Sequence, residues 1–92
     1  MRTAITLDID SDYLRVYNKT FLVIYEYTEG GDGFNEERYQ KCEVFHVYDN
    51  YNEINEITDL IQRTNDITKR NRPGYHPTLW DIITDKILEL YQ

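Results

Sequence analysis

Three aspartates in the run Asp8-Ile9-Asp10-Ser11-Asp12 are the first residues to test for chemistry. Carboxylates at alternate positions suit a hard cation such as calcium. A calcium loop of the helix-loop-helix type also requires glycine at its sixth position and glutamate at its twelfth. Those positions hold Tyr13 and Lys19, so the motif fails and we predict no metal site there.

The same aspartates resemble the Asp-x-Asp nucleophile motif of haloacid-dehalogenase-type phosphatases, which follows an apolar strand. That resemblance implies a small Asp-dependent phosphatase-like enzyme. However, those folds are larger than 92 residues, and Asp12 occupies the position that the family fills with a small apolar residue or threonine. A solvated acidic turn is the preferred interpretation, and we expect no catalytic residue.

Histidine and cysteine offer no better site. His46 and His76 are the only histidines, and Cys42 is the only cysteine. Alternation along a strand would place Cys42 and His46 on one face, but a zinc site needs about four ligands. We therefore interpret His46 as structural and Cys42 as a small core residue, with no cofactor. A single cysteine also excludes an internal disulfide and, with no signal peptide evident, indicates a reducing cytosol.

Two short motifs are candidates for contact with anions. Gly30-Gly31-Asp32-Gly33 is not a phosphate loop, because no Lys-Ser or Lys-Thr pair follows and the neighbouring carboxylates would repel phosphate. It is better explained as a hairpin tip, or as an acidic finger that enters a partner. Lys69-Arg70-Asn71-Arg72 is the one basic cluster. It could bind an anion, although such a run more often neutralises the dipole at the end of its own helix.

Strands are expected in the first half of the chain. Residues 3–9 alternate, with Ile5, Leu7 and Ile9 on one side, which is typical of a half-buried strand. Residues 20–28 contain the only five-residue apolar run, Phe21 to Tyr25, and predict a central strand buried on both faces, or nearly so. Residues 38–48 predict its antiparallel return strand. Residues 13–17 fit a short strand or a helical turn, and Asn18-Lys19 fits a turn.

Helices are expected in the second half. Ile54, Ile57 and Ile61 recur at helical spacing, so the pattern predicts a helix from about residue 51 to 69, opened by an Asn50–Glu53 capping box and stopped at Pro73-Gly74. Thr78 and Asp81 form a weaker capping pair for a second helix. The order of strands followed by helices predicts a single α+β domain over residues 1–92. It consists of a small antiparallel sheet of about three strands, including a long hairpin, packed against two C-terminal helices.

Composition limits the function. The net charge is −7, from 17 acidic and 10 basic residues, and nine residues are tyrosine. Phosphates would repel such a chain, so direct nucleic-acid binding is disfavoured and a basic partner is favoured. No apolar run is long enough to span a membrane. Tyrosine is enriched at protein interfaces, although it is also a good strand former.

The acidic residues form the candidate partner-binding surface. Carboxylates four residues apart on a helix are about 6 Å apart along its axis, and phosphates on one DNA strand are about 3.4 Å apart. Rows of helical carboxylates therefore provide a coarse copy of a phosphate backbone, although Arg63 and Lys86 interrupt them and acidic helix faces are common solvated surfaces. The rows and the hairpin tip comprise Glu53, Glu56, Asp59, Asp81, Asp85 and Glu89, together with Asp32, Glu36 and Glu37.

In length, acidity, tyrosine content and element order the whole chain resembles the Arn-type anti-restriction proteins of T-even bacteriophages. The resemblance depends on no diagnostic motif. It implies a phage-encoded DNA mimic that occupies the DNA-binding cleft of a host restriction endonuclease of the McrBC type, in the cytoplasm of the bacterial host. It also implies a homodimer, with contacts supplied by tyrosines or by the exposed parts of the Ile54-Ile57-Ile61 or Leu79-Ile83 stripes. The alternative is an anti-CRISPR protein or another phage interaction module that uses its tyrosines instead of its charge.

Overall fold

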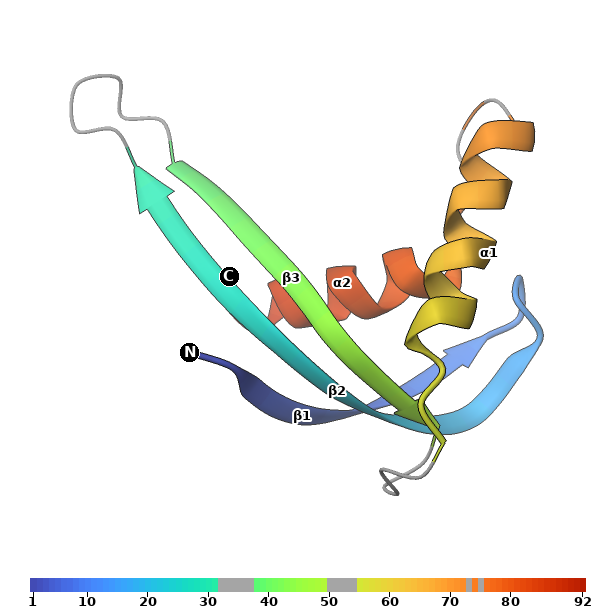
Figure 1. The fold of residues 1–92 in the computed structure, drawn as a ribbon, viewed down its shortest axis with the longest axis horizontal. Helices are drawn as coiled ribbons and strands as arrows, with labels where there is room; N and C mark the ends of the chain where they lie inside the picture. Colours follow the sequence, from blue (N-terminus) through green and yellow to red (C-terminus); the bar gives the residue numbers. More distant parts are fainter. Residues whose placement is uncertain (32–37, 50–54, 73, 75) are drawn as a thin grey trace.

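The computed structural model describes residues 1–31, 38–49, 55–72, 74 and 76–92. Within them the chain forms three strands and then two helices, as the sequence predicts (Figure 1). The elements are β1 (Thr3–Ser11), β2 (Val16–Gly31), β3 (Arg38–Asp49), α1 (Thr58–Asn71) and α2 (Leu79–Glu89).

The sheet is antiparallel in the order β1-β2-β3, so β2 is central and β1 and β3 are edge strands. Val23 at the middle of β2 pairs with Ile5 on one side and with Val47 on the other. The predicted central strand is confirmed, but it is longer than residues 20–28, since it spans 16 residues.

The turn between β1 and β2 lies earlier than predicted. Residues 12–15 form it, closed by a hydrogen bond from the Arg15 amide to the Asp12 carbonyl at 3.2 Å. Val16 and Tyr17 already belong to β2, and so do Asn18 and Lys19, for which the predicted turn is wrong. Asn18 lies at an irregularity in the β1–β2 register and has a φ of 50°, a left-handed conformation that asparagine tolerates. The local turn signal in Asn18 therefore marks a bulge within the strand.

A second irregularity changes the faces of β3. His46 pairs with Ile24 but Val44 pairs with Tyr25, so Phe45 is an extra residue in β3. Such a bulge ends strict alternation along the strand. Cys42 pairs with Tyr27 on the face that holds the core, whereas His46 lies on the opposite face. The prediction that Cys42 and His46 share a face is therefore wrong.

The apolar run in β2 is buried on one face only. Phe21, Val23 and Tyr25 are buried, while Leu22 and Ile24 are partly exposed. This difference arises because both helices pack on the same face of the sheet, the inner face, and leave the other, the outer face, without a covering layer among the described residues (Figure 1). The prediction of burial on both sides is thus correct for the inner face and wrong for the outer one.

The first helix begins later than predicted. Residues 55–57 are not helical, because their backbone extends the edge of β3: the Ile57 amide donates to the Val47 carbonyl at 2.8 Å, and the Asp49 amide donates to the Asn55 carbonyl at 2.9 Å. Glu56 forms an isolated antiparallel bridge with Tyr48. The proposed Asn50–Glu53 capping box lies outside the described residues. The helix ends at Asn71, two residues after the predicted end.

The second helix begins as predicted. The Thr78 hydroxyl accepts from the Asp81 amide at 3.4 Å, and the Asp81 carboxylate accepts from the Thr78 amide at 3.0 Å. Together these bonds form the capping box that the sequence indicates, with Thr78 as the N-cap residue.

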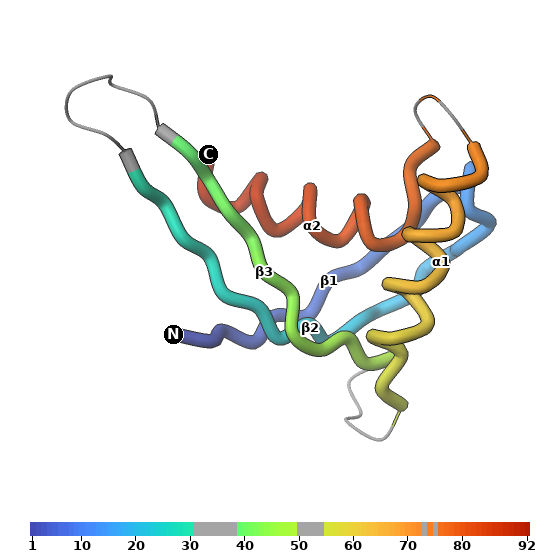
Figure 2. Tube along the Cα trace, turned by 45° about the horizontal axis from the view of Figure 1, so that its top comes forward, coloured from blue at the N-terminus to red at the C-terminus, as the bar shows by residue number. Residues whose placement is uncertain are grey.

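The core lies between the inner face of the sheet and the two helices. α2 contributes Ile83 and Ile87, both fully buried, and α1 contributes Ile61. Figure 2 shows α2 lying along the concave side of the bent strands. α1 lies beside the start of α2 and runs in a different direction. Among the described residues, the buried apolar side chains are Leu7, Ile9, Phe21, Val23, Tyr25, Val44, Val47, Ile61, Ile83 and Ile87.

Candidate functional site

The predicted acidic surface is only partly available to a partner. Asp32, Glu36, Glu37 and Glu53 lie outside the described residues, so the structure gives them no position. The other five predicted residues fall into two groups. Glu56 and Asp81 are engaged within the protein, whereas Asp59, Asp85 and Glu89 are exposed and form no ion pair with the described residues.

Asp81 is a structural carboxylate. Besides capping α2, it accepts from the Lys69 ammonium on α1 at 2.8 Å, which ties the two helices together. Partial burial acts to raise the pKa of Asp81, but the hydrogen bonds from Lys69 and Thr78 outweigh it and lower the pKa below its usual value. A carboxylate held in this way offers less charge to a partner than a free one.

Glu56 contacts the sheet and does not lie on a helix. Its Oε1 atom is 2.6 Å from Nδ1 of His46 and accepts from the Thr58 hydroxyl at 3.0 Å. The hydrogen bond to His46 and then the one to Thr58 lower the pKa of Glu56. His46 therefore serves to hold the segment before α1 against β3, which agrees with a structural role.

The available carboxylates extend beyond the predicted set. Sequence reasoning assigned the first strand's aspartates to possible metal chemistry and overlooked Asp66, which lies two turns after Asp59 on α1. The seven-residue spacing of Asp59 and Asp66 was the signal that could have found it. Exposed carboxylates without an ion pair in the described part of the chain are Asp8, Asp10, Asp12, Glu29, Glu43, Asp59, Asp66, Asp85 and Glu89.

These carboxylates lie on three parts of the surface. Asp59 and Asp66 lie on α1, and Asp85 and Glu89 lie one turn apart on α2. The others lie on the strands and on the β1–β2 turn. The start of α1 and the end of α2 both lie away from the segment between the two helices, so these two helix ends are far apart in the molecule (Figure 2).

Two acidic residues meet on the outer face of the sheet. Glu26 on β2 pairs directly with Glu43 on β3, an arrangement in which like charges repel. The N-terminal ammonium of Met1 lies 2.9 Å from the Glu26 carboxylate, and this hydrogen bond lowers the pKa of Glu26. One charge of the pair is thereby offset, and Glu43 remains exposed.

The Asp8-Asp10-Asp12 run has no metal-binding geometry. Asp8 and Asp10 belong to β1, Asp12 belongs to the turn, and the Asp8 carboxylate accepts from the Thr20 hydroxyl at 2.7 Å. Over the described residues, no three His, Cys, Asp or Glu side chains are grouped so that they could hold a metal ion. Cys42 is partly buried, and burial raises the pKa of its thiol, which makes the thiol less reactive.

Three tyrosines contact one another where the C-terminus meets β2. The Tyr91 ring stacks on Tyr27 with centroids 3.7 Å apart, and the Tyr91 hydroxyl lies 2.7 Å from the Tyr25 hydroxyl. Burial and this hydrogen bond raise the pKa of Tyr25 to about 12. Through these contacts Tyr91, next to the C-terminal residue, packs against β2. Among the described tyrosines, those more than half exposed are Tyr13, Tyr17 and Tyr39.

Comparisons of the chain with protein-family models, with curated proteins and with solved structures gave no significant match. None of the described helices has the length and apolar character needed to cross a membrane.

Proposed function

We propose that this protein is a non-enzymatic DNA mimic, which inhibits a host DNA-binding defence protein by occupying its DNA-binding cleft. The nine exposed carboxylates that form no ion pair in the described chain carry this proposal. The target class is a restriction endonuclease subunit, such as one of the McrBC type. A bacteriophage origin and action in the cytoplasm of the bacterial host belong to the same proposal.

The physical argument concerns counterions. A cleft that grips DNA presents lysine and arginine side chains to phosphates and releases condensed salt ions on binding. Asp85 and Glu89 are about 6 Å apart along the axis of α2, and Asp59 and Asp66 face solvent on α1. Carboxylates on rigid helices offer such a cleft fixed negative charges, so binding should weaken as salt rises.

A homodimer would extend the charged surface, and we retain it as part of the proposal. The isoleucine stripes are poor candidates for the contact, because Ile61 and Ile83 are buried in the core of one chain. The exposed tyrosines Tyr13, Tyr17 and Tyr39 are better candidates.

The test is charge reversal at sites that do not hold the fold. The variant Asp59→Lys/Asp66→Lys/Asp85→Lys/Glu89→Lys should lose inhibition of DNA binding by the target endonuclease, measured by competition at about 50 and about 200 mM salt. Asp81 is left unchanged, since reversing it would break the capping box. The control Arg63→Glu/Lys86→Glu makes the same helices more acidic and should preserve or strengthen inhibition. Full inhibition by the quadruple lysine variant would refute a mimic surface on the helices.

A second candidate is an interaction module that uses the sheet, such as an anti-CRISPR protein. The outer face favours it, because Leu22, Ile24 and Phe45 remain partly exposed there and no described helix covers them. Affinity capture from host lysate at low and high salt separates the two functions. A partner released by salt supports mimicry, while a partner that stays bound at high salt and is lost on Ile24→Asp supports the sheet.

A further inference from the structure

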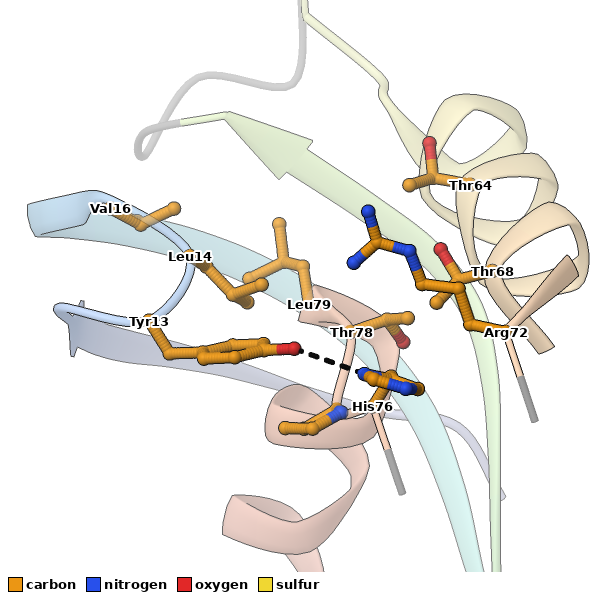
Figure 3. Close-up of a pocket in the computed structure, with 10 residues that line it drawn as sticks. Tyr13, Leu14, Val16, Thr64, Thr68, Arg72, His76, Thr78 and Leu79 are labelled. Carbon is orange, nitrogen blue, oxygen red and sulfur yellow. Dashed lines mark hydrogen bonds between the residues drawn. The ribbon is translucent and has the colours of Figure 1, made fainter. Parts of the chain in front are cut away.

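A pocket of about 250 Å³ lies where the β1–β2 turn meets the end of α1 and the start of α2 (Figure 3). It is separate from the acidic surface and includes Arg72, the last residue of the basic cluster. Its walls are Tyr13, Leu14, Val16, Thr64, Thr68, Arg72, His76, Pro77, Thr78 and Leu79.

The charge of the pocket is opposite to that of the protein. Although the chain carries 17 acidic residues, none of the lining residues is acidic. The lining includes the Arg72 guanidinium, which forms no ion pair with any described residue. Figure 3 shows this group extending over the space between Thr68 and Leu79. A guanidinium with free donors favours a carboxylate or phosphate, which it can bind with two parallel hydrogen bonds.

Further polar groups surround the guanidinium. Thr68 lies one helical turn before Arg72, and its hydroxyl has no hydrogen-bond partner in the described chain. His76 shares a hydrogen bond of 3.3 Å between Nδ1 and the Tyr13 hydroxyl, which leaves Nε2 without a described partner. The negative end of the α1 dipole opposes an anion here. Arg70 in the last turn offsets it in part, whereas the Lys69 charge is already paired with Asp81.

Four of the lining side chains are apolar. Leu14 and Val16 come from the strand side, and Pro77 and Leu79 come from the start of α2. The pocket is smaller than the 300–1,000 Å³ or so typical of drug-sized ligands, so it suits a molecule of about one ring.

From this arrangement we propose that the pocket binds a small organic anion, namely a single aromatic or aliphatic body that carries one carboxylate or phosphate. Arg72 and Thr68 hold the anionic group, and Leu14, Val16 and Leu79 enclose the apolar body. This binding is independent of the acidic surface and of the proposed inhibitor function.

The test is an NMR titration of the full ¹⁵N-labelled chain with three probes. Phenyl phosphate combines the two required parts, phenol lacks the anion, and inorganic phosphate lacks the ring. Phenyl phosphate should bind at least about tenfold more tightly than either fragment, as expected when a charged hydrogen bond and apolar burial act together. The chemical-shift changes that phenyl phosphate causes in the protein should map to residues 13–16, 64–72 and 76–79. Absence of saturable binding, equal affinity for inorganic phosphate, or shifts located elsewhere would overturn the proposal.

Two matched variants identify the anion contact. Arg72→Gln should weaken phenyl phosphate binding by about tenfold or more and leave phenol binding unchanged. Arg70→Gln removes the same charge from an exposed position outside the pocket and should weaken binding much less than Arg72→Gln does. Thr68→Val gives a second, smaller loss with the backbone preserved, so the result does not depend on one variant folding. Equal binding by the Arg72→Gln and Arg70→Gln proteins would contradict the assignment of Arg72.

Discussion

The two helices begin in different ways. α2 begins with bonds between near neighbours, since Thr78 and Asp81 are three residues apart and cap each other. α1 begins at Thr58 after the N-cap residue Ile57, which makes no side-chain cap, and the bonds that fix its start reach back to β3. One start is encoded locally, and the other is imposed by the sheet.

The start of α1 shows how the sheet prevails over helical periodicity. The Val47 carbonyl accepts from the Ile57 amide, and the Val47 amide donates to the Thr58 hydroxyl at 2.8 Å. Both bonds satisfy backbone groups on the open edge of β3, which would otherwise be costly to bury. Helix formation before Thr58 would remove these partners. Local spacing therefore predicts a helix start only where no strand edge competes for the same backbone.

The largest expected effect concerns the core that both helices share. Ile83→Ala, at a fully buried position of α2, should lower the free energy of unfolding by about 2–5 kcal/mol, because it removes apolar contacts and leaves a cavity. Urea denaturation measures the loss. The control Leu60→Ala, at a side chain of α1 that is 63% exposed, should change stability by less than about 0.5 kcal/mol. Equal losses would show that α2 does not anchor the core.

The next largest effect is expected from a variant that removes a hydrogen bond between β3 and the start of α1. Thr58→Val keeps the shape of the side chain but leaves the Val47 amide without its acceptor, which should cost about 1–3 kcal/mol. Hydrogen exchange at Val47 should accelerate as well. Thr64→Val is the matched control, since the Thr64 hydroxyl is exposed and bonds only within its own helix. If Val47 stays as protected in Thr58→Val as in the control, the sheet does not set the start of α1.

A smaller loss of stability should follow from removing the capping box at the start of α2. Thr78→Ala removes the cap of α2 and should cost about 0.5–2 kcal/mol, with faster exchange confined to the first turn of α2 and its contact with Asn65. Thr78→Ser keeps the hydroxyl and should restore most of the stability. Accelerated hydrogen exchange at Val47 in Thr78→Ala would mean that the starts of α1 and α2 are coupled and not fixed independently.

The smallest effect is the pH dependence of the Asp81 cap. The folded protein lowers the pKa of Asp81, so this carboxylate stabilises the fold above the unfolded pKa of about 3.9 and loses that contribution as pH falls through the folded value. Asp81→Asn should therefore be less stable than wild type near neutral pH, by about 0.3–1 kcal/mol, and should approach it in strong acid. Denaturation midpoints between pH 2 and 7 or so measure the convergence.

Asp85→Asn serves as the control for that experiment, because Asp85 is exposed and outside any described ion pair. It should change stability at neutral pH by less than about 0.5 kcal/mol. If the difference in stability between Asp81→Asn and wild type persists unchanged into strong acid, the ionised Asp81 carboxylate does not have the proposed role.

Much of the fold follows from short-range patterns. Alternation of Leu7 and Ile9 located β1, and the Thr78–Asp81 spacing located α2, since in both cases neighbouring residues determine the outcome. The failures arise at Asn18 and Phe45, where a bulge changes the strand, and at Ile57, where β3 competes with the helix. Each failure depends on a pairing partner distant in sequence, which no local pattern contains.

The candidate site was less predictable than the fold. Acidic composition identified Asp59, Asp85 and Glu89 as solvent-facing carboxylates, because a charged side chain opposite an apolar stripe is exposed in most folds. Composition could not show that Asp81 is bound by Lys69, since that contact depends on how the two helices pack. The pocket at Arg72 was equally hidden, because it assembles from a turn and two helix ends.

The edge position of β1 has a further consequence. An edge strand offers unpaired backbone groups to which a second copy of the same strand can add, and this is how sheets aggregate. Asp8 and Asp10 lie along that edge strand, and Asp12 follows in the turn after it. Two copies that approach edge to edge would bring these like charges together. We therefore expect the aspartate run to disfavour edge-to-edge association of this sheet.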